Sequence, residues 1–504
     1  MVTTGAITRW LPPLAVGAVS FLVLLTTLQP GVDFWDTAEL QAVGPLMGTA
    51  HPTGFPAYVL LGWFASVVLS PFGEPAFRMN LLAALCVAAA AGVTVDLTRA
   101  LTRSVALGVA AGLGLAATGI VWSIGTHAET HALHLLLAAV LFRSLIAWAD
   151  AEPGRSRDRW LLLSAIVYGV AMANHSLTLL LAPGIGLYVL AVEPSILRRP
   201  RMVLACGAAL LLTTGLLFLE LPLRAGPFRA PLVYGHPETW DGFWSIVLAE
   251  QFRGSLVAPF SDLPLKVAEL ASRTVTAFGV LAALIPAGFV VTALLRPRYA
   301  LLSGVSVAIT CFFAASYVNA DIGRYYLVPA LLAWTWLAIL TGAVARVIVD
   351  ERLDRDPRLR SATTLALAIA LLIPTGLAFG SRAAAVDRSG NVDARLWLDS
   401  TLKAMEPDAV IVSWWSYSTP LWYAQHVQGR RPDVAIIDDR TRLDEDLGDI
   451  YDVIDSNLPA RPVYVIRADP REIAELERRY VLDHLAGVDA RTLTRVVATR
   501  ESGA

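Results

Sequence analysis

Eleven apolar stretches of roughly membrane-crossing length fill the first 380 residues of this 504-residue chain. A helix needs about 20 mostly apolar residues to cross the hydrocarbon layer of a bilayer. The sequence therefore predicts an all-α polytopic membrane domain over residues 1–380, with about eleven transmembrane helices. The two stretches on either side of Asn174 and His175 form either a helical hairpin or one broken helix. The predicted spans are 11–29, 78–98, 104–124, 128–148, 160–174, 176–193, 202–221, 275–295, 299–318, 325–347 and 362–380.

Positive charge is distributed unevenly among the loops between these stretches. Cytoplasmic loops of membrane proteins are enriched in Lys and Arg, and in an eleven-span arrangement all the Arg-rich loops fall on one side. The first loop on the other side, residues 31–77, contains no Lys or Arg. We therefore expect a cytoplasmic N-terminus, exterior loops at 31–77 and 222–273, and an exterior C-terminal domain. The Arg-rich loops lie near residues 99–103, 155–159, 198–201, 296–298 and 346–360.

The chain changes character after residue 380. Residues 385–504 are rich in Asp, Glu and Arg and contain short apolar runs at 409–412, 434–437 and 462–466. Short buried-strand patterns between polar segments are typical of a small soluble α/β domain. The aromatic side chains of this region either pack in the core of that domain or stack on a sugar or peptide. They are Trp414, Trp415, Tyr417, Trp422 and Tyr423.

Composition excludes some classes of protein and indicates a source. The net charge of -2 and the isoelectric point near 6.5 argue against nucleic-acid binding, which requires a basic surface. The three cysteines each lie within an apolar run, so neither a disulfide framework nor a CxxC metal site is indicated. The Ala- and Arg-rich composition is typical of a GC-rich bacterial genome. We therefore expect a multi-pass protein of the bacterial plasma (inner) membrane, with its exterior domain in the periplasm or outside the cell.

The first exterior loop carries two acidic residues three positions apart, Asp36 and Glu39. On a helix they would project from the same face, at the mouth of the membrane domain. A carboxylate held at a low-dielectric edge has the raised basicity of a general base, although a solvated turn would show the same pattern. The apolar stretch 58–69 that follows is too short to span and indicates a helix lying in the outer interface.

A second polar cluster stands at the exterior end of a predicted span. His127, His131 and His134 share one helical face, which is suited either to a transition metal or to hydrogen bonds with neighbouring loops. Glu129 is costly at the start of a span unless it is paired or functional. The sequence indicates no required cofactor, and it does not decide whether the protein binds a divalent metal.

Three exterior arginines are candidate phosphate ligands: Arg78, Arg224 and Arg324. A guanidinium group binds phosphate through two parallel hydrogen bonds. The alternative for each is contact with lipid headgroups.

Several motifs, in the same order along the chain, resemble one family. The segments 35–39 (WDTAE), 51–58 (HPTGFPAY) and 78–82 (RMNLL) are similar to D-S/T-G/A-E, HPPGYPLY and R-x-N-L-L. Further similarity lies at 128–134, 221–224, 235–240, 420–425 and 430–434. These motifs are those of the GT-C glycosyltransferases related to the eukaryotic transmembrane protein O-mannosyltransferase, and they extend over nearly the whole chain.

This resemblance implies transfer of a sugar, mannose by preference, from a polyprenyl-phosphate carrier to an acceptor hydroxyl on a protein Ser or Thr or on a glycan. It implies that Asp36 deprotonates the acceptor while Glu39 and Glu129 orient the substrates. Arg224 and Arg324 would neutralise the departing phosphate. The remaining residues that the resemblance places in substrate binding are His51, Arg78, His131 and Tyr325.

The chain departs from the family pattern at several positions. His131 and His134 replace a Tyr and an Asn, and residues 413–417 lack an acidic residue often found there. The sequence therefore does not identify the acceptor substrate. Two other functions are compatible with the sequence: a transporter or flippase of a lipid-linked glycan, and an inactive membrane scaffold. Transporters place ionisable residues near the midplane and often contain inverted repeats. Here the ionisable residues gather at one face and no repeat is visible.

Overall fold

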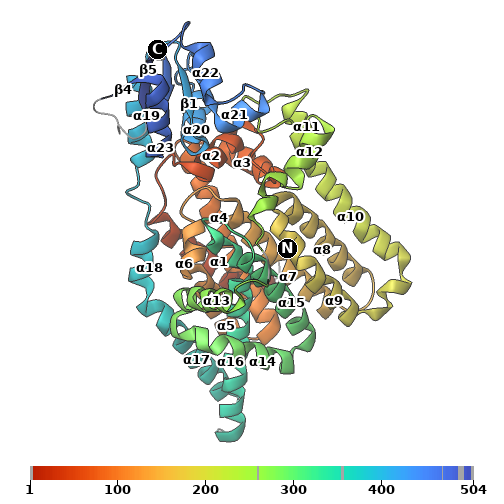
Figure 1. The fold of residues 1–504 in the computed structure, drawn as a ribbon. Coiled ribbons are helices and arrows are strands. Elements are labelled where there is room, and N and C mark those ends of the chain that lie inside the picture. The colour runs from red at the N-terminus through yellow and green to blue at the C-terminus, as the bar shows by residue number, and fades with distance from the viewer. Residues whose placement is uncertain (1–3, 258–259, 353–356, 468, 486–492, 501–504) are drawn as a thin grey trace.

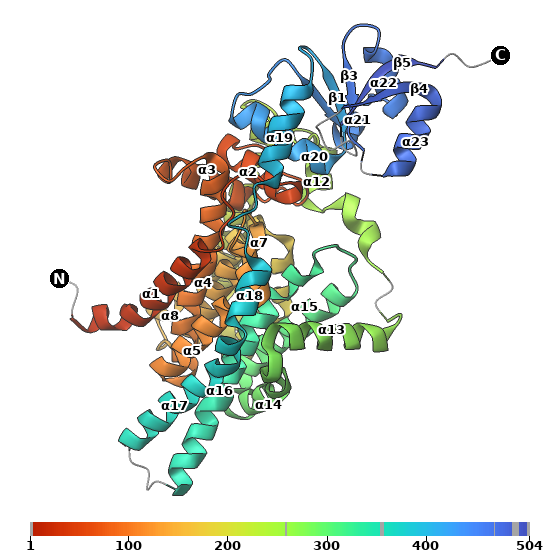
Figure 2. The ribbon, with the colours of Figure 1, turned by 90° about the vertical axis from the view of Figure 1, so that its left-hand side faces the viewer.

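A helical bundle and a smaller α/β unit stacked on one end of it make up the chain (Figures 1 and 2). The computed structural model describes residues 4–257, 260–352, 357–467, 469–485 and 493–500. The all-α membrane domain and the small C-terminal α/β domain predicted from the sequence are both present. Helix α18 continues to Val386, and the α/β unit begins with α19 after a linker at residues 387–392.

The centre of the bundle is formed by α4, against which α1, α5 and α7 pack. Residues of α4 such as Ala84, Ala90 and Val95 are almost completely buried, because small side chains allow close contact between helices. The first seven helices are α1 (Thr4–Leu25), α2 (Trp35–Leu46), α3 (Pro56–Val68), α4 (Pro75–Thr102), α5 (Val105–Ala116), α6 (Gly119–Ile124) and α7 (Thr130–Asp150).

The remaining elements of the bundle surround this centre and include several short 3-10 helices (η). They are α8 (Arg155–Asn174), η1 (Ser176–Leu181), α9 (Ala182–Val192), η2 (Pro194–Arg198), α10 (Pro200–Phe218), α11 (Glu220–Ala225), α12 (Trp240–Val247), η3 (Glu250–Ser255), α13 (Leu263–Phe278), η4 (Gly279–Leu284), α14 (Ile285–Leu295), α15 (Pro297–Ala315), η5 (Ile322–Tyr326), α16 (Leu327–Arg352), α17 (Pro357–Leu377) and α18 (Phe379–Val386).

Within the described residues, seven helical segments are long and apolar enough to cross a membrane by length and composition. They are Pro75–Thr102, Thr130–Asp150, Pro200–Ala225, Leu263–Leu295, Pro297–Ala315, Ile322–Val349 and Arg358–Leu377. Three further predicted spans coincide with shorter apolar helices, Arg9–Leu25, Val105–Ala116 and Ser176–Val192, and the span at 160–174 lies within α8. Each of the eleven predicted regions is therefore helical, although some helices are interrupted.

Two of these interruptions have identifiable causes. Between α5 and α6 the Thr118 hydroxyl donates to the carbonyl oxygen of Gly114 at 2.8 Å and accepts from the Trp334 indole at 2.9 Å. Between α13 and η4, Gly279 has a φ of +58°, a conformation that glycine adopts without steric cost. Because α13 begins at Leu263, it occupies part of the segment predicted as a long exterior loop, and in Figure 2 it runs across the bundle.

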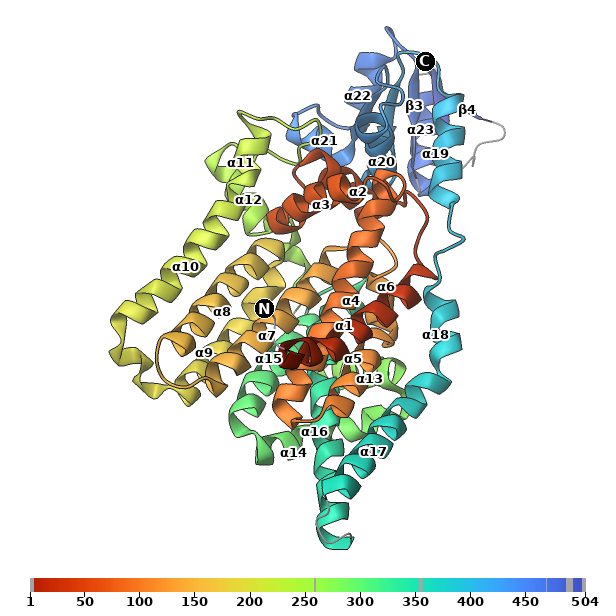
Figure 3. The same ribbon diagram turned by 180° about the vertical axis from the view of Figure 1, so that it is seen from behind.

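The stretches on either side of His175 form a hairpin. Arg199, just before α10, bonds to Asp158 in the first turn of α8 at 2.7 Å and to Glu193 at the end of α9 at 2.8 Å. The start of α8 and the end of α9 therefore lie at the same end of the bundle, and His175 turns the chain at the other. Figure 3 shows α8, α9 and α10 together at one edge of the bundle.

Helices α2 and α3 lie across the bundle end beneath the α/β unit (Figure 3). They contact at Gly44 and Gly62, where an added Cβ would meet the Met79 side chain at 2.5 and 2.7 Å. Helix α3 exposes Trp63, Phe64 and neighbouring valines. This apolar outer face agrees with the interfacial helix predicted at 58–69.

The α/β unit contains a five-stranded sheet of order β2-β1-β3-β5-β4. Strands β1, β2 and β3 are parallel, whereas β5 is antiparallel to both of its neighbours. The three predicted strands are confirmed, and β4 and β5 were not predicted. The elements are α19 (Asp393–Ala404), β1 (Val410–Ser413), α20 (Trp415–Trp422), the π-helix η6 (Tyr423–Val427), β2 (Ala435–Asp438), α21 (Asp439–Asp444), α22 (Ile450–Asn457), β3 (Val463–Val465), α23 (Pro470–Arg479), β4 (Tyr480–His484) and β5 (Thr494–Thr499).

Candidate active site

A cavity of about 950 Å³ lies where the bundle meets the α/β unit. Segments far apart in the sequence line it, including the start of α2, the turn before α3, the start of α7, the α8–η1 turn and η5. Its lining includes charged, aromatic and apolar side chains. Among the sequence-predicted site residues, the lining contains Asp36, His51, Glu129, His131, Arg324 and Tyr325.

Arg324 joins two carboxylates from different parts of the bundle. Its Nη1 donates to Glu129 Oε2 at 2.8 Å, and its Nη2 donates to Asp36 Oδ2 at 3.2 Å. The Glu129 side chain is 6% exposed and that of Asp36 is 32% exposed. Asp36 is therefore the carboxylate more open to a substrate in the cavity, and Arg324 is a cation positioned beside it.

Glu129 caps helix α7. Its Oε1 accepts hydrogen bonds from the backbone N–H of His131 at 3.2 Å and from His131 Nδ1 at 2.8 Å. An acidic N-cap satisfies free backbone donors and interacts favourably with the helix dipole. The buried carboxylate thus has the partners that its position requires.

Glu39 is the other predicted acid of α2, and it lies behind His51 rather than in the main cavity. Its side chain is 1% exposed. It accepts from the backbone N–H of His51 at 3.0 Å and forms an ion pair with His51 Nδ1. Burial disfavours a charged His51, but the Glu39 carboxylate more than compensates and raises the pKa of His51 to about 9. Glu39 faces a second cavity of about 200 Å³ under the α/β unit.

Asn80 on α4 holds the segments around Asp36 in place. It is completely buried, and its Nδ2 donates to the carbonyl oxygens of Gln29 and Gly31 at 3.0 and 3.2 Å. Its Oδ1 accepts from Gln41 Nε2 on α2 and from the backbone N–H of Ala128, both at 2.8 Å. One side chain therefore fixes the first loop relative to α2 and to the start of α7.

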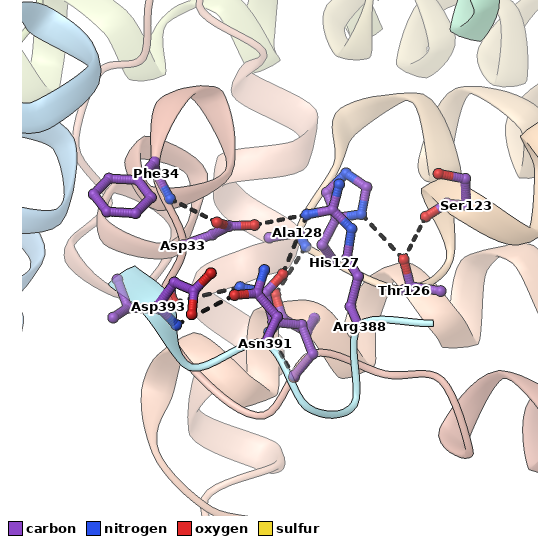
Figure 4. A network of polar contacts seen from close by, with 12 residues as sticks. Asp33, Phe34, Ser123, Thr126, His127, Ala128, Arg388, Asn391 and Asp393 are labelled. Carbon is purple, nitrogen blue, oxygen red and sulfur yellow. Dashed lines mark hydrogen bonds and ion pairs between the residues drawn. The ribbon is translucent and has the colours of Figure 1, made fainter. Parts of the chain in front are cut away.

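A related network joins the linker before α19 to the same loop (Figure 4). Arg388 Nη1 donates to Asp33 Oδ2 at 2.7 Å, and the backbone N–H of Arg388 donates to the carbonyl oxygen of Thr27 at 3.1 Å. His127 lies beside Arg388 in Figure 4, and its Nδ1 is 3.3 Å from Thr126 Oγ1. Arg388, Asp33 and His127 all line the cavity.

Two predicted phosphate ligands do not line the main cavity. Arg78 donates to the backbone carbonyls of Gly73 and Ser66 at 2.7 and 2.9 Å. Arg224 donates to those of Met47 and Leu46 at 2.7 and 3.0 Å. Both guanidinium groups brace loops in this structure, and their positions give no support to phosphate binding in the cavity.

The histidine face predicted on α7 is separated into different environments. His131 lines the cavity, whereas His134 lies behind it and approaches Thr178 Oγ1 at 3.4 Å. In the part of the chain that the structure describes, no group of three or more His, Cys, Asp or Glu side chains is arranged to hold a metal ion.

One wall of the cavity is apolar. Tyr325 is stacked on Tyr317 at 5.6 Å and on Phe313 at 6.3 Å between ring centroids. Leu256 and Phe252 complete this side of the lining. The cavity thus combines a charged centre with an apolar wall.

Several lining residues were not predicted as site residues: His175, Arg388 and Asp33. Nothing in the local sequence distinguishes His175, because the hairpin alone brings it to the cavity. Arg388 is the second arginine after the last apolar span, and nothing in the sequence distinguishes it from Arg382, which does not line the cavity. Of the aromatic cluster, Trp414 and Trp415 line the cavity, whereas Trp422 and Tyr423 are buried in packing.

Comparisons with known proteins agree with this architecture. Residues 36–196 match the family model described as the protein O-mannosyl-transferase TMEM260 N-terminal domain. The chain is 26% identical over 451 residues to protein O-mannosyl-transferase TMEM260 of Mus musculus, covering 84% of this chain and 61% of the mouse protein.

Solved structures extend the comparison to the whole fold. ArnT from Cupriavidus metallidurans bound to undecaprenyl phosphate superposes with a TM-score of 0.60 at 14% identity, covering 98% of both chains. The Archaeoglobus fulgidus oligosaccharyltransferase, in a complex with Zn and sulfate, has a TM-score of 0.55 at 14% identity and covers 90% of this chain and 68% of that one. The chain is thus similar to protein O-mannosyl-transferase TMEM260, whose N-terminal domain model matches residues 36–196, and it has the GT-C fold of ArnT.

Proposed function

We propose that this protein transfers a sugar from a polyprenyl-phosphate carrier to the hydroxyl of a protein Ser or Thr, and that this sugar is mannose. The observation that carries this proposal is the bridge that Arg324 forms between Asp36 and Glu129 in the main cavity. This bridge supports the proposal because a cation suited to a phosphate lies next to a carboxylate suited to accept a proton. The similarity to protein O-mannosyl-transferase TMEM260 supports the class of reaction. The similarity to ArnT, whose structure contains undecaprenyl phosphate, supports the class of donor.

The proposed reaction is a direct displacement at the anomeric carbon. The acceptor oxygen forms a bond to this carbon, its proton passes to Asp36, and the bond to the phosphate oxygen breaks with both electrons leaving on the phosphate. Donors aimed at charge that develops in the transition state accelerate such a step most strongly. Arg324 is suited to the departing phosphate because its guanidinium group is a cation that lines the cavity and binds phosphate oxygens well.

The phosphate of the donor would compete with Asp36 for Arg324. The contact of Arg324 with Asp36 is 3.2 Å, longer than its 2.8 Å contact with Glu129. Binding of a phosphate to Nη2 would leave Asp36 free to act as the base, while Glu129 keeps the guanidinium in place. Glu39, buried against His51, would then position α2 instead of contacting the substrates.

The proposal assigns the positive charge beside the departing phosphate to Arg324 and routes no step through a metal. We expect transfer to proceed at the same rate after dialysis against a chelator. A loss of activity that a single divalent metal restores would require a different phosphate partner.

The sidedness of the site is also a proposal. Arg-rich loops at the opposite end of the bundle support an exterior cavity by the positive-inside rule. A bacterial plasma membrane, with the site facing the periplasm or the outside of the cell, agrees with the composition. The apolar wall formed by Phe313 and Tyr317 supports an approach of the lipid carrier from the bilayer.

The test is sugar transfer by the purified full-length protein from radiolabelled polyprenyl-phosphate mannose to a Ser/Thr-rich peptide and to a membrane and secreted-protein extract. Asp36→Asn should lower the rate by about 10²- to 10⁴-fold, the contribution of a general base. Asp241→Asn, an exposed position on α12 outside the cavity lining, is the matched control and should retain the wild-type rate. If wild type transfers no sugar from this or any other lipid-phosphate donor, the proposed function is wrong. If Asp36→Asn remains active, only the assignment of the base is wrong.

A further inference from the structure

A continuous row of rings lines the cavity from the His51 turn to η5. Neighbouring ring centroids lie 4.5 to 5.7 Å apart, which is the usual range for aromatic pairs. The row continues past Glu129, so it lies next to the charged centre described above. Its members, in order of contact, are His51, Phe55, His175, His131 and Tyr325.

The protonation of His175 follows from one backbone contact. The backbone N–H of Leu177 donates to His175 Nδ1 at 3.2 Å, and His175 thereby caps η1. A backbone N–H can only donate, so Nδ1 carries no proton, and the neutral ring carries its proton on Nε2. Among the described residues the structure gives this Nε2–H no hydrogen-bond acceptor. His175 therefore offers a donor to the cavity that it lines.

In His131 the other ring nitrogen, Nδ1, carries the proton. Its Nδ1 lies 2.8 Å from Glu129 Oε1. Glu129 also accepts from Arg324, as an ionised carboxylate does, so His131 Nδ1 is the donor and Nε2 carries a lone pair. This Nε2 is buried and has no partner within the described structure. A buried acceptor without a donor costs free energy, so the site is incomplete without a hydroxyl or a similar group.

We propose that His131 and His175 together bind one hydroxyl of the transferred sugar, with His175 Nε2–H donating to it and His131 Nε2 accepting from it. Phe55 and Tyr325 flank the pair and would pack against the C–H face of the sugar ring. This inference rests on the proposed function and names how its donor is recognised. No sequence motif marked His175 for this role.

The pair also predicts which sugars are rejected at this position. A hydroxyl both donates and accepts, so it satisfies both nitrogens. A carboxylate would face the lone pair of His131 Nε2, and an ammonium group would face the N–H of His175. The cavity therefore selects neutral hexoses over uronic acids and cationic amino sugars whose charged group occupies this position.

The experiment compares polyprenyl-phosphate mannose with donors that each lack one sugar hydroxyl, using purified full-length protein. Wild type should lose at least tenfold in kcat/KM on one of the deoxy donors, since a missing hydroxyl leaves both nitrogens unpaired. His175→Asn keeps an N-cap acceptor for η1 but lacks the distal N–H. It should lose a similar factor on the parent donor and lose nothing more on that deoxy donor.

His134→Asn is the control. His134 is 5.9 Å from His175 between ring centroids but does not line the cavity, so this variant should keep the wild-type preference among donors. A rise in the thermal midpoint on addition of polyprenyl phosphate without a sugar verifies that each variant is folded.

Two outcomes overturn the inference while leaving sugar transfer intact: wild type accepts every deoxy donor equally well, or the effects of His175→Asn and of the missing hydroxyl multiply. Equal acceptance of every deoxy donor by wild type overturns the inference even if His175→Asn does not fold. Failure of wild type on every lipid-phosphate sugar would instead overturn the proposed function.

Discussion

Helices α4 and α7 hold a buried carboxylate at each end of their contact, and the two ends differ in how many arginines surround that carboxylate. At the end away from the α/β unit, Asp96 of α4 is 4% exposed. It bonds to Arg99 and, at 2.5 Å, to Arg143 of α7, and Arg9 lies 3.9 Å away. At the other end Glu129 and Asp36 share a single guanidinium, that of Arg324.

The two clusters also differ in their surroundings. Asp96 lies outside the lining of the main cavity, whereas Glu129, Asp36 and Arg324 all belong to it. Arg324 Nε and His131 Nε2 have no partner among the described residues. Buried polar groups normally have hydrogen-bond partners. We therefore interpret the cluster at Asp96 as structural and the cluster at Arg324 as a site in which a substrate supplies the missing partners.

The largest expected difference between the clusters is in activity. Arg324→Gln removes the cation proposed to stabilise the phosphate and should lower kcat/KM by about 10²- to 10³-fold. Arg143→Gln, the matched change at the other end, should leave kcat/KM within twofold for the folded protein. Steady-state transfer assays on both variants measure this difference, and equal losses in the two would remove the distinction.

Thermal stability should depend more on the Asp96 cluster than on the Arg324 cluster. Asp96→Asn leaves Arg143 and Arg99 without their anion, and breaking a buried ion pair costs about 3 kcal/mol. We expect the thermal midpoint in detergent to fall by several degrees, with the activity per folded molecule unchanged. If this variant keeps its midpoint but loses transfer, the Asp96 cluster acts on the reaction.

The pH dependence of stability should be traceable to His51. Because the pKa of His51 is raised from 6.5 to about 9, its pairing with Glu39 stabilises the fold fully below pH 6.5. This contribution is lost as the pH rises through about 9. The thermal midpoint of wild type should therefore fall by a few degrees between pH 6.5 and pH 9.5, and that of His51→Gln should fall less. Parallel curves for the two proteins would contradict a charged His51.

The smallest effect is expected between the two domains. Glu74, before α4, forms an ion pair with Arg395 of α19, and both side chains are partly exposed. Such pairs contribute about 1 kcal/mol or less and are screened by salt. Arg395→Ala should lower the thermal midpoint slightly at low ionic strength and have no effect at 1 M salt, with KM unchanged. A shift that persists in high salt would point to lost packing of the arginine stem.

Much of the fold could be predicted from the sequence because lipid imposes a simple rule on it. Spans must be apolar and helical, so their positions are visible in the sequence. The interruptions are less visible because they depend on tertiary contacts, such as the hydrogen bonds of Thr118 with Gly114 and Trp334. Strands β4 and β5 were missed because exposed polar residues interrupt them, and Asp483 and His484 do not suggest a strand.

The site was predicted in part for a similar reason. Acids near a span are few and conspicuous, so Asp36 and Glu129 could be named from the sequence as candidates, and both line the cavity. Arg78 and Arg224 show the limit of charge as a signal, since a guanidinium that braces a backbone carbonyl looks the same in sequence as one that binds phosphate. His175 and Arg388 reach the cavity through the path of the chain, which no local pattern encodes.

The bond between the backbones of Thr27 and Arg388 has a mechanical consequence. It joins the exit of the first helix to the linker that leads into the α/β unit, and the Arg388 side chain bonds to Asp33 of the first loop. Asp33 precedes Asp36 by three residues, so the linker is fastened close to the proposed base. The position of the α/β unit and the geometry of the cavity are therefore coupled through this linker.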